Sequence, residues 1–125
     1  MRFARWVFMV AGVIGMIIMV PMYFLEERLG LDHPPAITHP EIYYGFVGVT
    51  LAWQLMFLAI AFDPVRFRLG MLPAVVEKAS YVVAVLVLYM LGRVSGIVSG
   101  FAVLDAVWMV LFTVAFIRLT MERGS

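Results

Sequence analysis

The sequence predicts an all-α membrane protein: an antiparallel bundle of four transmembrane helices with both chain termini in the cytoplasm. Of its 125 residues, 65% are hydrophobic and only 14% are charged, whereas a soluble domain is about half apolar and about a quarter charged. Four apolar runs each approach the ~20 residues that a helix needs to cross a bilayer. Stretches of alternating polarity, typical of a membrane β-barrel, do not occur in the sequence.

The runs define one transmembrane domain, residues 1–125. The expected spans are 6–25, 42–62, 73–92 and 97–118. The first run is too long for the apolar part of a cleaved signal peptide, and no small-x-small cleavage site precedes Glu26. Asp63 should end the second span because a residue before proline is pushed out of the helical region. Pro73 suits the first turn of the third span.

The distribution of Lys and Arg predicts the orientation, because short cytoplasmic loops carry the excess of basic residues. Arg28 and Arg93 fall on one side of the predicted bundle. The other side holds seven, namely Arg2, Arg5, Arg66, Arg68, Lys78, Arg118 and Arg123. Both termini and the 63–78 connection are therefore expected in the cytoplasm. The 26–41 loop and a tight turn near Ser95 are expected outside.

Charge and cysteine content exclude several classes of protein. A net charge of +1 leaves no basic face for nucleic acid. The chain has no cysteine, which excludes disulfides and thiolate metal sites. The unequal charge distribution disfavours the small fluoride channels, which insert in both orientations. The first span lacks a carboxylate, which disfavours the four-helix multidrug exporters.

The 26–41 loop carries carboxylates and two imidazoles, a set that could in principle bind a divalent metal. His33 and His39, however, are six residues apart with prolines around them, so they share no helical face. We expect no metal site and no cofactor. Pro40 is expected in the first turn of the second span, with Glu41 at the positive helix N-terminus.

Asp105 is the strongest candidate for a functional residue, since an ionisable side chain at membrane depth is costly. Tyr89 and Arg93 are four residues apart on the third span, so they share a face that could meet Asp105 across the hairpin. Two interpretations stay open. Arg93 satisfies Asp105 and locks the hairpin, or the cluster accepts a proton or binds a ligand.

Gln54 and Trp53 lie deep in the second span. An amide at this depth commonly hydrogen-bonds a neighbouring helix, a contact worth around 1 kcal/mol. It could equally recognise a polar atom of a ligand, so both residues join Asp105 as candidates for a ligand-binding site.

The cytoplasmic connection FDPVRFRLGMLPAVVEK, residues 62–78, gathers much of the charge of the chain interior. Arg66 and Arg68 can face anionic lipid headgroups, and Lys78 can extend its ammonium toward the interface. Glu77 is expected to form a structural salt bridge with Arg66 or Arg68. The alternative for Glu77 is a headgroup or substrate site at the inner mouth.

The stretch THPEIYYGFVGVTLAWQLMFLAIAFDPVRFRLGMLPAVVEK, residues 38–78, resembles small bacterial four-span membrane proteins. In size and topology the chain is similar to DoxX-type proteins. The resemblance covers about a third of the chain and contains no catalytic signature. It implies a multi-pass protein of the bacterial inner membrane and assigns no functional residue. A sterol-isomerase-like four-span domain, with its acidic pocket, is an analogy of architecture only.

Two functions fit these observations. The first is a non-enzymatic helical bundle that self-associates or joins a membrane complex, because glycines recur in stripes and no catalytic motif is present. The second is a protein that binds or transports a lipid or an uncharged small molecule, or an isomerase-like enzyme, with an acidic pocket around Asp105. The second function requires Asp105 and Gln54 to line one shared cavity.

Overall fold

The computed structural model describes residues 1–94 and 96–124, and within these residues it contains helices and no strands. Four of the helices are long and apolar enough to cross a membrane. They are α1 (Arg2–Met22), α3 (Pro40–Phe62), α4 (Met71–Met90) and α5 (Gly96–Gly124). The prediction of an all-α chain with four helices of membrane-spanning length is confirmed.

The helix ends differ from the expected spans mainly by extension. α1 begins at Arg2, and α5 continues past 118 to Gly124. A helix does not stop where its apolar run stops, because backbone hydrogen bonds continue into the interface. α3 begins at Pro40 and ends before Asp63, as the proline positions predict. Ser95, near the expected outer turn, lies outside the described residues.

The long loop between α1 and α3 contains a short helix that the sequence analysis did not predict, α2 (Glu26–Asp32). Two glutamates lie in its first turn, where they complement the positive helix N-terminus. Arg28 Nε lies 3.0 Å from Asp32 Oδ2, one turn along the same helix. The Tyr44 hydroxyl donates a 2.8 Å hydrogen bond to Glu26 Oε2, which joins α2 to α3.

Two turns frame α4. A 3₁₀ turn, η1 (Arg68–Gly70), leads into it, so Pro73 is its third residue. At its other end, Gly92 has a φ of +70°. The Gly92 N–H donates to the Tyr89 carbonyl at 2.9 Å, and the Arg93 N–H donates to the Leu88 carbonyl at 2.8 Å. This is the Schellman pattern, which requires the left-handed conformation that glycine adopts most readily.

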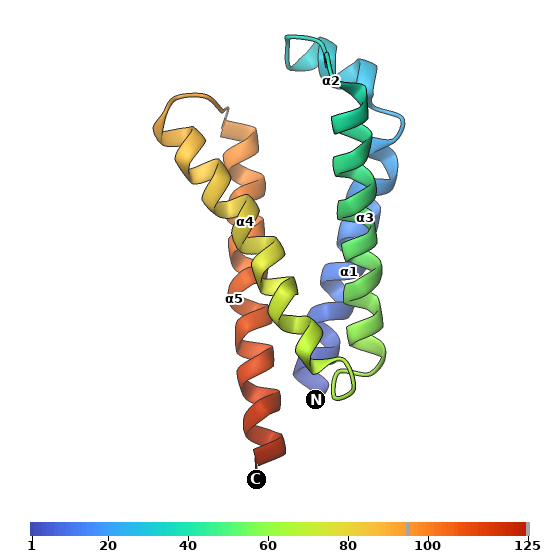
Figure 1. Cartoon of the computed structure of the whole chain (residues 1–125), viewed down its shortest axis with the longest axis vertical. Coiled ribbons are helices and arrows are strands. Elements are labelled where there is room, and N and C mark those ends of the chain that lie inside the picture. The colour runs from blue at the N-terminus through green and yellow to red at the C-terminus, as the bar shows by residue number, and fades with distance from the viewer. Residues whose placement is uncertain (95, 125) are drawn as a thin grey trace.

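The helices form two pairs arranged as a V (Figure 1). α1 packs along α3, and α4 packs along α5. The pairs meet at the end of the molecule that holds the N- and C-termini, and they diverge toward the end that holds α2 and the α4–α5 turn.

The core shared by all four helices lies at the narrow end of the V. Phe8 of α1 stacks on Phe112 of α5, with ring centroids 4.2 Å apart. Phe57 of α3 meets both rings edge-on, at 6.0 and 4.9 Å. Met71 at the start of α4 is fully buried in the same cluster. Aromatic contact therefore holds the two pairs together at one end.

Large apolar side chains cover the outside of the helices. Ile17, Val76 and Met90 are 67%, 64% and 77% exposed, and many others are similar. Contiguous apolar surface on this scale is unfavourable in water and natural against hydrocarbon. The exterior thus agrees with a chain surrounded by lipid.

Candidate functional site

A cavity of about 970 Å³ lies between the two helix pairs, on the side of the aromatic core away from the termini. Four helices and the α2 segment contribute to its wall. Most of the wall is aliphatic or aromatic, and the aromatic members are Phe46, Trp53, Tyr81, Phe101 and Trp108. A concave apolar site with a few convergent polar groups is the usual form of a small-molecule pocket.

Three charged side chains meet on the wall formed by α4 and α5. Lys78 Nζ lies 3.4 Å from Asp105 Oδ1 and 3.6 Å from Glu77 Oε2. Its side chain is 8% exposed, and those of Glu77 and Asp105 are 18% and 20% exposed. Lys78 Nζ also lies 5.2 Å from the centroid of the Phe57 ring. We call Glu77, Lys78 and Asp105 the charged cluster.

The charged cluster lies well inside the membrane-spanning helices. Lys78 is seven residues past Met71 and Asp105 is nine past Gly96, which corresponds to about 10 Å and about 14 Å along the two helices. Charged groups at such depth pair with one another or mark a functional site. Here the three charged side chains pair with one another and also line the cavity.

Gln54 lines the same cavity from α3. Its Nε2 donates a 2.9 Å hydrogen bond to the Thr50 carbonyl one turn earlier, and this bond fixes the orientation of the amide. Its Oε1 is buried and has no hydrogen-bond partner among the described residues. The amide lies against Gly15 of α1, where any side chain would displace it.

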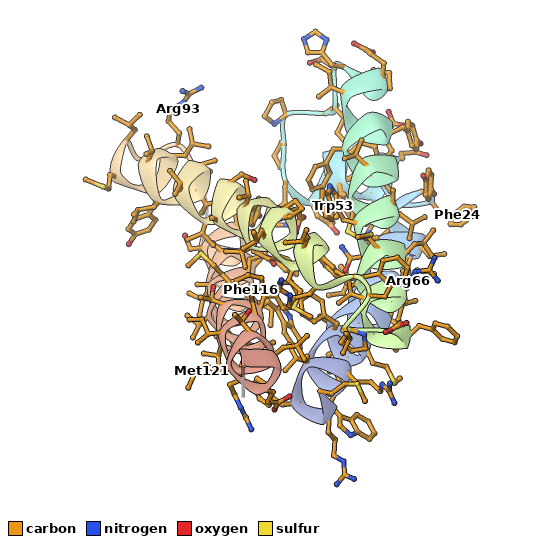
Figure 2. All side chains as sticks on the ribbon, turned by 60° about the horizontal axis from the view of Figure 1, so that its bottom comes forward. Phe24, Trp53, Arg66, Arg93, Phe116 and Met121 are labelled. Atoms are coloured by element: carbon orange, nitrogen blue, oxygen red, sulfur yellow. The ribbon has the colours of Figure 1, made fainter. Side chains whose placement is uncertain are left out.

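Trp53, the neighbour of Gln54, also lines the cavity. It lies on the side of α3 that faces α4 (Figure 2). The structure therefore brings together three of the five residues expected at a ligand site, namely Asp105, Gln54 and Trp53.

The other two, Tyr89 and Arg93, do not line this cavity. Tyr89 is 60% exposed, and Arg93 is exposed at the far end of α4 (Figure 2). The structure pairs Asp105 with Lys78 instead of Arg93. The reason is register: Arg93 lies beside the hairpin turn, whereas Asp105 lies more than two helical turns below it.

The expected salt bridge between Glu77 and Arg66 or Arg68 is not what the structure has. Glu77 is paired with Lys78, about 9 Å along α4 from its start. Arg68 donates from Nη1 to Thr120 Oγ1 at 2.9 Å and lies over the Phe116 ring. The Arg66 side chain is exposed on the outside of the molecule (Figure 2).

Sequence reasoning missed Lys78 as a site residue and placed it at the interface. It is 7% exposed because its face of α4 turns toward α5 and the cavity. Tyr81 and Trp108 also line the cavity and were not singled out, and His33, considered only as a metal ligand, lines it as well. A lysine directly after a glutamate, one turn or more inside an apolar span, was the available signal.

Among residues 1–94 and 96–124, no group of three or more metal-ligating side chains is placed to hold an ion. His39 Nδ1 lies 3.8 Å from Glu41 Oε1 at the start of α3. Comparison of the chain with protein-family models, with curated proteins and with solved structures gave no match.

Proposed function

We propose that this chain is a multi-pass protein of the bacterial inner membrane, similar in size and topology to DoxX-type proteins, that binds a small amphipathic molecule or a lipid within the bilayer. One observation carries the proposal: Gln54, Glu77, Lys78 and Asp105 line a single cavity although they come from three helices. Packing alone would have placed Gln54 and Asp105 in separate helix contacts. Binding, and not catalysis, is the proposed activity of the pocket.

A small amphipathic molecule or a lipid has an apolar part that matches the apolar wall and a polar part that matches the polar groups. An apolar body would cover the aliphatic and aromatic wall, and a polar head would reach the charged cluster or the Gln54 amide. Burial of polar groups costs free energy unless they are hydrogen-bonded. A ligand that supplies the missing partner therefore gains affinity and orientation at once.

In the proposed orientation, both termini and the α3–α4 connection lie in the cytoplasm, and the four long helices form an antiparallel bundle in the membrane. Six basic residues on the inner side against two on the outer side support this orientation, once Lys78 is left out because it lies inside α4. The narrow, core-filled end of the V then faces the cytoplasm. The wide end, with α2, faces outward, and a ligand enters from that side or from the outer leaflet.

The experiment that tests this function uses the three tryptophans of the chain. Trp53 and Trp108 line the cavity, whereas Trp6 is 60% exposed on the outside. In the Trp6→Phe variant, a ligand that enters the cavity should change the emission of the remaining two. Native mass spectrometry of the purified protein should first identify any retained lipid or small molecule. No retained mass, and no emission change with any amphipathic probe, would contradict the proposal.

Self-association remains a second candidate, and one observation favours it. A Cβ at Gly45 or Gly100 would have no atom within 4 Å, so both backbones are open to close approach by another helix. Gly100→Leu and Gly45→Leu should then reduce the oligomer observed in mild detergent. If the oligomeric state is the same in wild type and both variants, these glycines carry no interface.

A further inference from the structure

We infer that the ligand of the cavity is an organic monocation, with one protonated amine on an apolar, preferably aromatic, body. The inference rests on the proposed function and names its class of ligand. Three properties of the wall support it: the charge of the cluster, the chemistry of its unpartnered atoms, and the aromatic side chains beside them.

The charge of the wall is the first property. The cavity is lined by two carboxylates, Glu77 and Asp105, and by one ammonium, Lys78. His33 also lines the cavity, on the α2 side. In their charged forms, the members of the charged cluster leave one negative charge in excess. A low-dielectric surrounding penalises this excess, and a single positive charge on the ligand removes it.

The unpartnered atoms are the second property. Gln54 Oε1 and Glu77 Oε2 are buried acceptors that receive no hydrogen bond among the described residues, although Glu77 Oε2 has Lys78 Nζ at 3.6 Å as its ion-pair partner. Two donors of the same residue group are engaged elsewhere, since Lys78 Nζ donates to Asp105 and Gln54 Nε2 donates to Thr50. These two buried acceptors therefore lack a hydrogen-bond donor. A primary ammonium group brings up to three N–H donors and no acceptor.

The aromatic wall is the third property. Trp53 and Trp108 line the cavity with three other aromatic side chains, and the electron-rich face of such a ring attracts a cation. The protein already holds its own cation in this way, since Lys78 Nζ lies 5.2 Å from the Phe57 centroid. An anion would meet two carboxylates, and a neutral alcohol would leave the excess charge unbalanced.

Three probes with one apolar body test the inference: 8-phenyloctylamine, 8-phenyloctanol and 8-phenyloctanoate. Each is titrated, at neutral pH, into the Trp6→Phe protein in zwitterionic phosphatidylcholine nanodiscs, and the tryptophan emission gives the dissociation constant. Empty nanodiscs measure partition into lipid, which is subtracted. We expect the amine to bind at least about tenfold more tightly than the alcohol, and the carboxylate to bind most weakly.

Variants assign the preference to the charged cluster. Glu77→Gln removes the excess charge without changing shape, so the amine should lose its advantage over the alcohol. Asp105→Asn is the second variant. It removes the same excess charge and tests the same loss of amine preference if Glu77→Gln does not fold. Glu41→Gln is the matched control because it makes the same chemical change at a side chain that is 72% exposed and outside the cavity. The amine preference should persist in this control.

The outcomes separate the inference from the function on which it rests. Equal binding of amine and alcohol, tighter binding of the carboxylate, or an amine preference that survives both cluster variants would overturn the monocation and leave the binding function standing. If none of the three probes binds and no retained mass is found, the binding function fails and the ligand class fails with it.

Discussion

Lys78 Nζ lies 3.4 Å from Asp105 Oδ1, although the two residues are 27 positions apart and on different helices. Lys78 also meets Glu77, so one ammonium serves two carboxylates in the interior of the spans. Lys78, at the end of the 62–78 stretch, and Asp105, in the fourth apolar run, thus share one site although they lie in separate regions of the sequence. The loss of stability on removing one charge should therefore depend on whether Lys78, Glu77 or Asp105 is replaced.

Replacement of Lys78 should destabilise the protein more than replacement of either carboxylate. Lys78→Met leaves two carboxylates side by side with no cation, and breaking a buried pair in this way costs about 3 kcal/mol. Asp105→Asn leaves Lys78 paired with Glu77 and should cost about 1 kcal/mol. Thermal unfolding in one detergent, followed by circular dichroism, measures the order of the two variants.

The double variant Lys78→Met, Asp105→Asn provides the check on this ranking. It should recover part of the stability lost in Lys78→Met, because the second carboxylate is no longer charged. Arg28→Gln, at an exposed pair on α2, should leave the melting temperature nearly unchanged. A melting temperature of Lys78→Met equal to that of the Arg28 variant would mean that the pair contributes little.

Gly12 should not tolerate a side chain, because α1 and α3 approach closely at this position. A Cβ there would lie 2.8 Å from Leu58 Cδ2 and 3.0 Å from the Gln54 carbonyl oxygen, and the backbone atom cannot rotate away. Gly12→Ala should therefore lower the free energy of unfolding by about 1–3 kcal/mol. Gly45→Ala is the matched change on α3 with open space around it. It should be neutral or slightly stabilising; similar losses in both variants would refute the close contact.

The aromatic core should determine whether the two helix pairs stay together. Phe112 is fully buried and contacts both Phe8 and Phe57. Phe112→Ala should cost about 3–5 kcal/mol and loosen the junction. Phe62→Ala changes the same residue type at a position that is 83% exposed, and it should cost far less. Limited proteolysis and unfolding in mixed micelles compare the two.

The cavity and its orientation can be tested with single cysteines, because the chain has none of its own. Ala84→Cys lies on the cavity wall, Ala115→Cys in the core, and Val110→Cys on the outside of α5. A membrane-impermeant thiol reagent added to the outside of intact cells should label the first and spare the other two. Labelling of Ala84→Cys only in inverted vesicles would reverse the proposed topology.

Most of the fold could be predicted from the sequence because each helix is set by local properties. Apolar length defines the four long helices, Pro40 and Asp63 bound α3, and Gly92 ends α4 within the predicted limit. α2 escaped prediction because seven residues with acidic groups in the first turn are too short to give a clear apolar period.

The site was harder to predict because it depends on register between helices. Arg93 was expected to meet Asp105 because both were taken to lie near the turn between the third and fourth spans. In the hairpin, Met90 and Gly96 are level, so Asp105, nine residues into α5, is level with Tyr81. Lys78 lies one turn from Tyr81 on the same helix and is therefore the cation within reach. How the α1–α3 pair faces this hairpin follows from aromatic packing, which no local pattern encodes.

The position of the aromatic core has a consequence for the width of the cavity. Because the four helices share a core only at the narrow end, the wide ends are held at their distance mainly by what surrounds them. Under the proposed binding function, lateral pressure and bilayer thickness should therefore affect the binding constant. The cavity should be narrower in a tightly packed membrane than in a micelle, and the affinity for the proposed ligand should differ accordingly between the two.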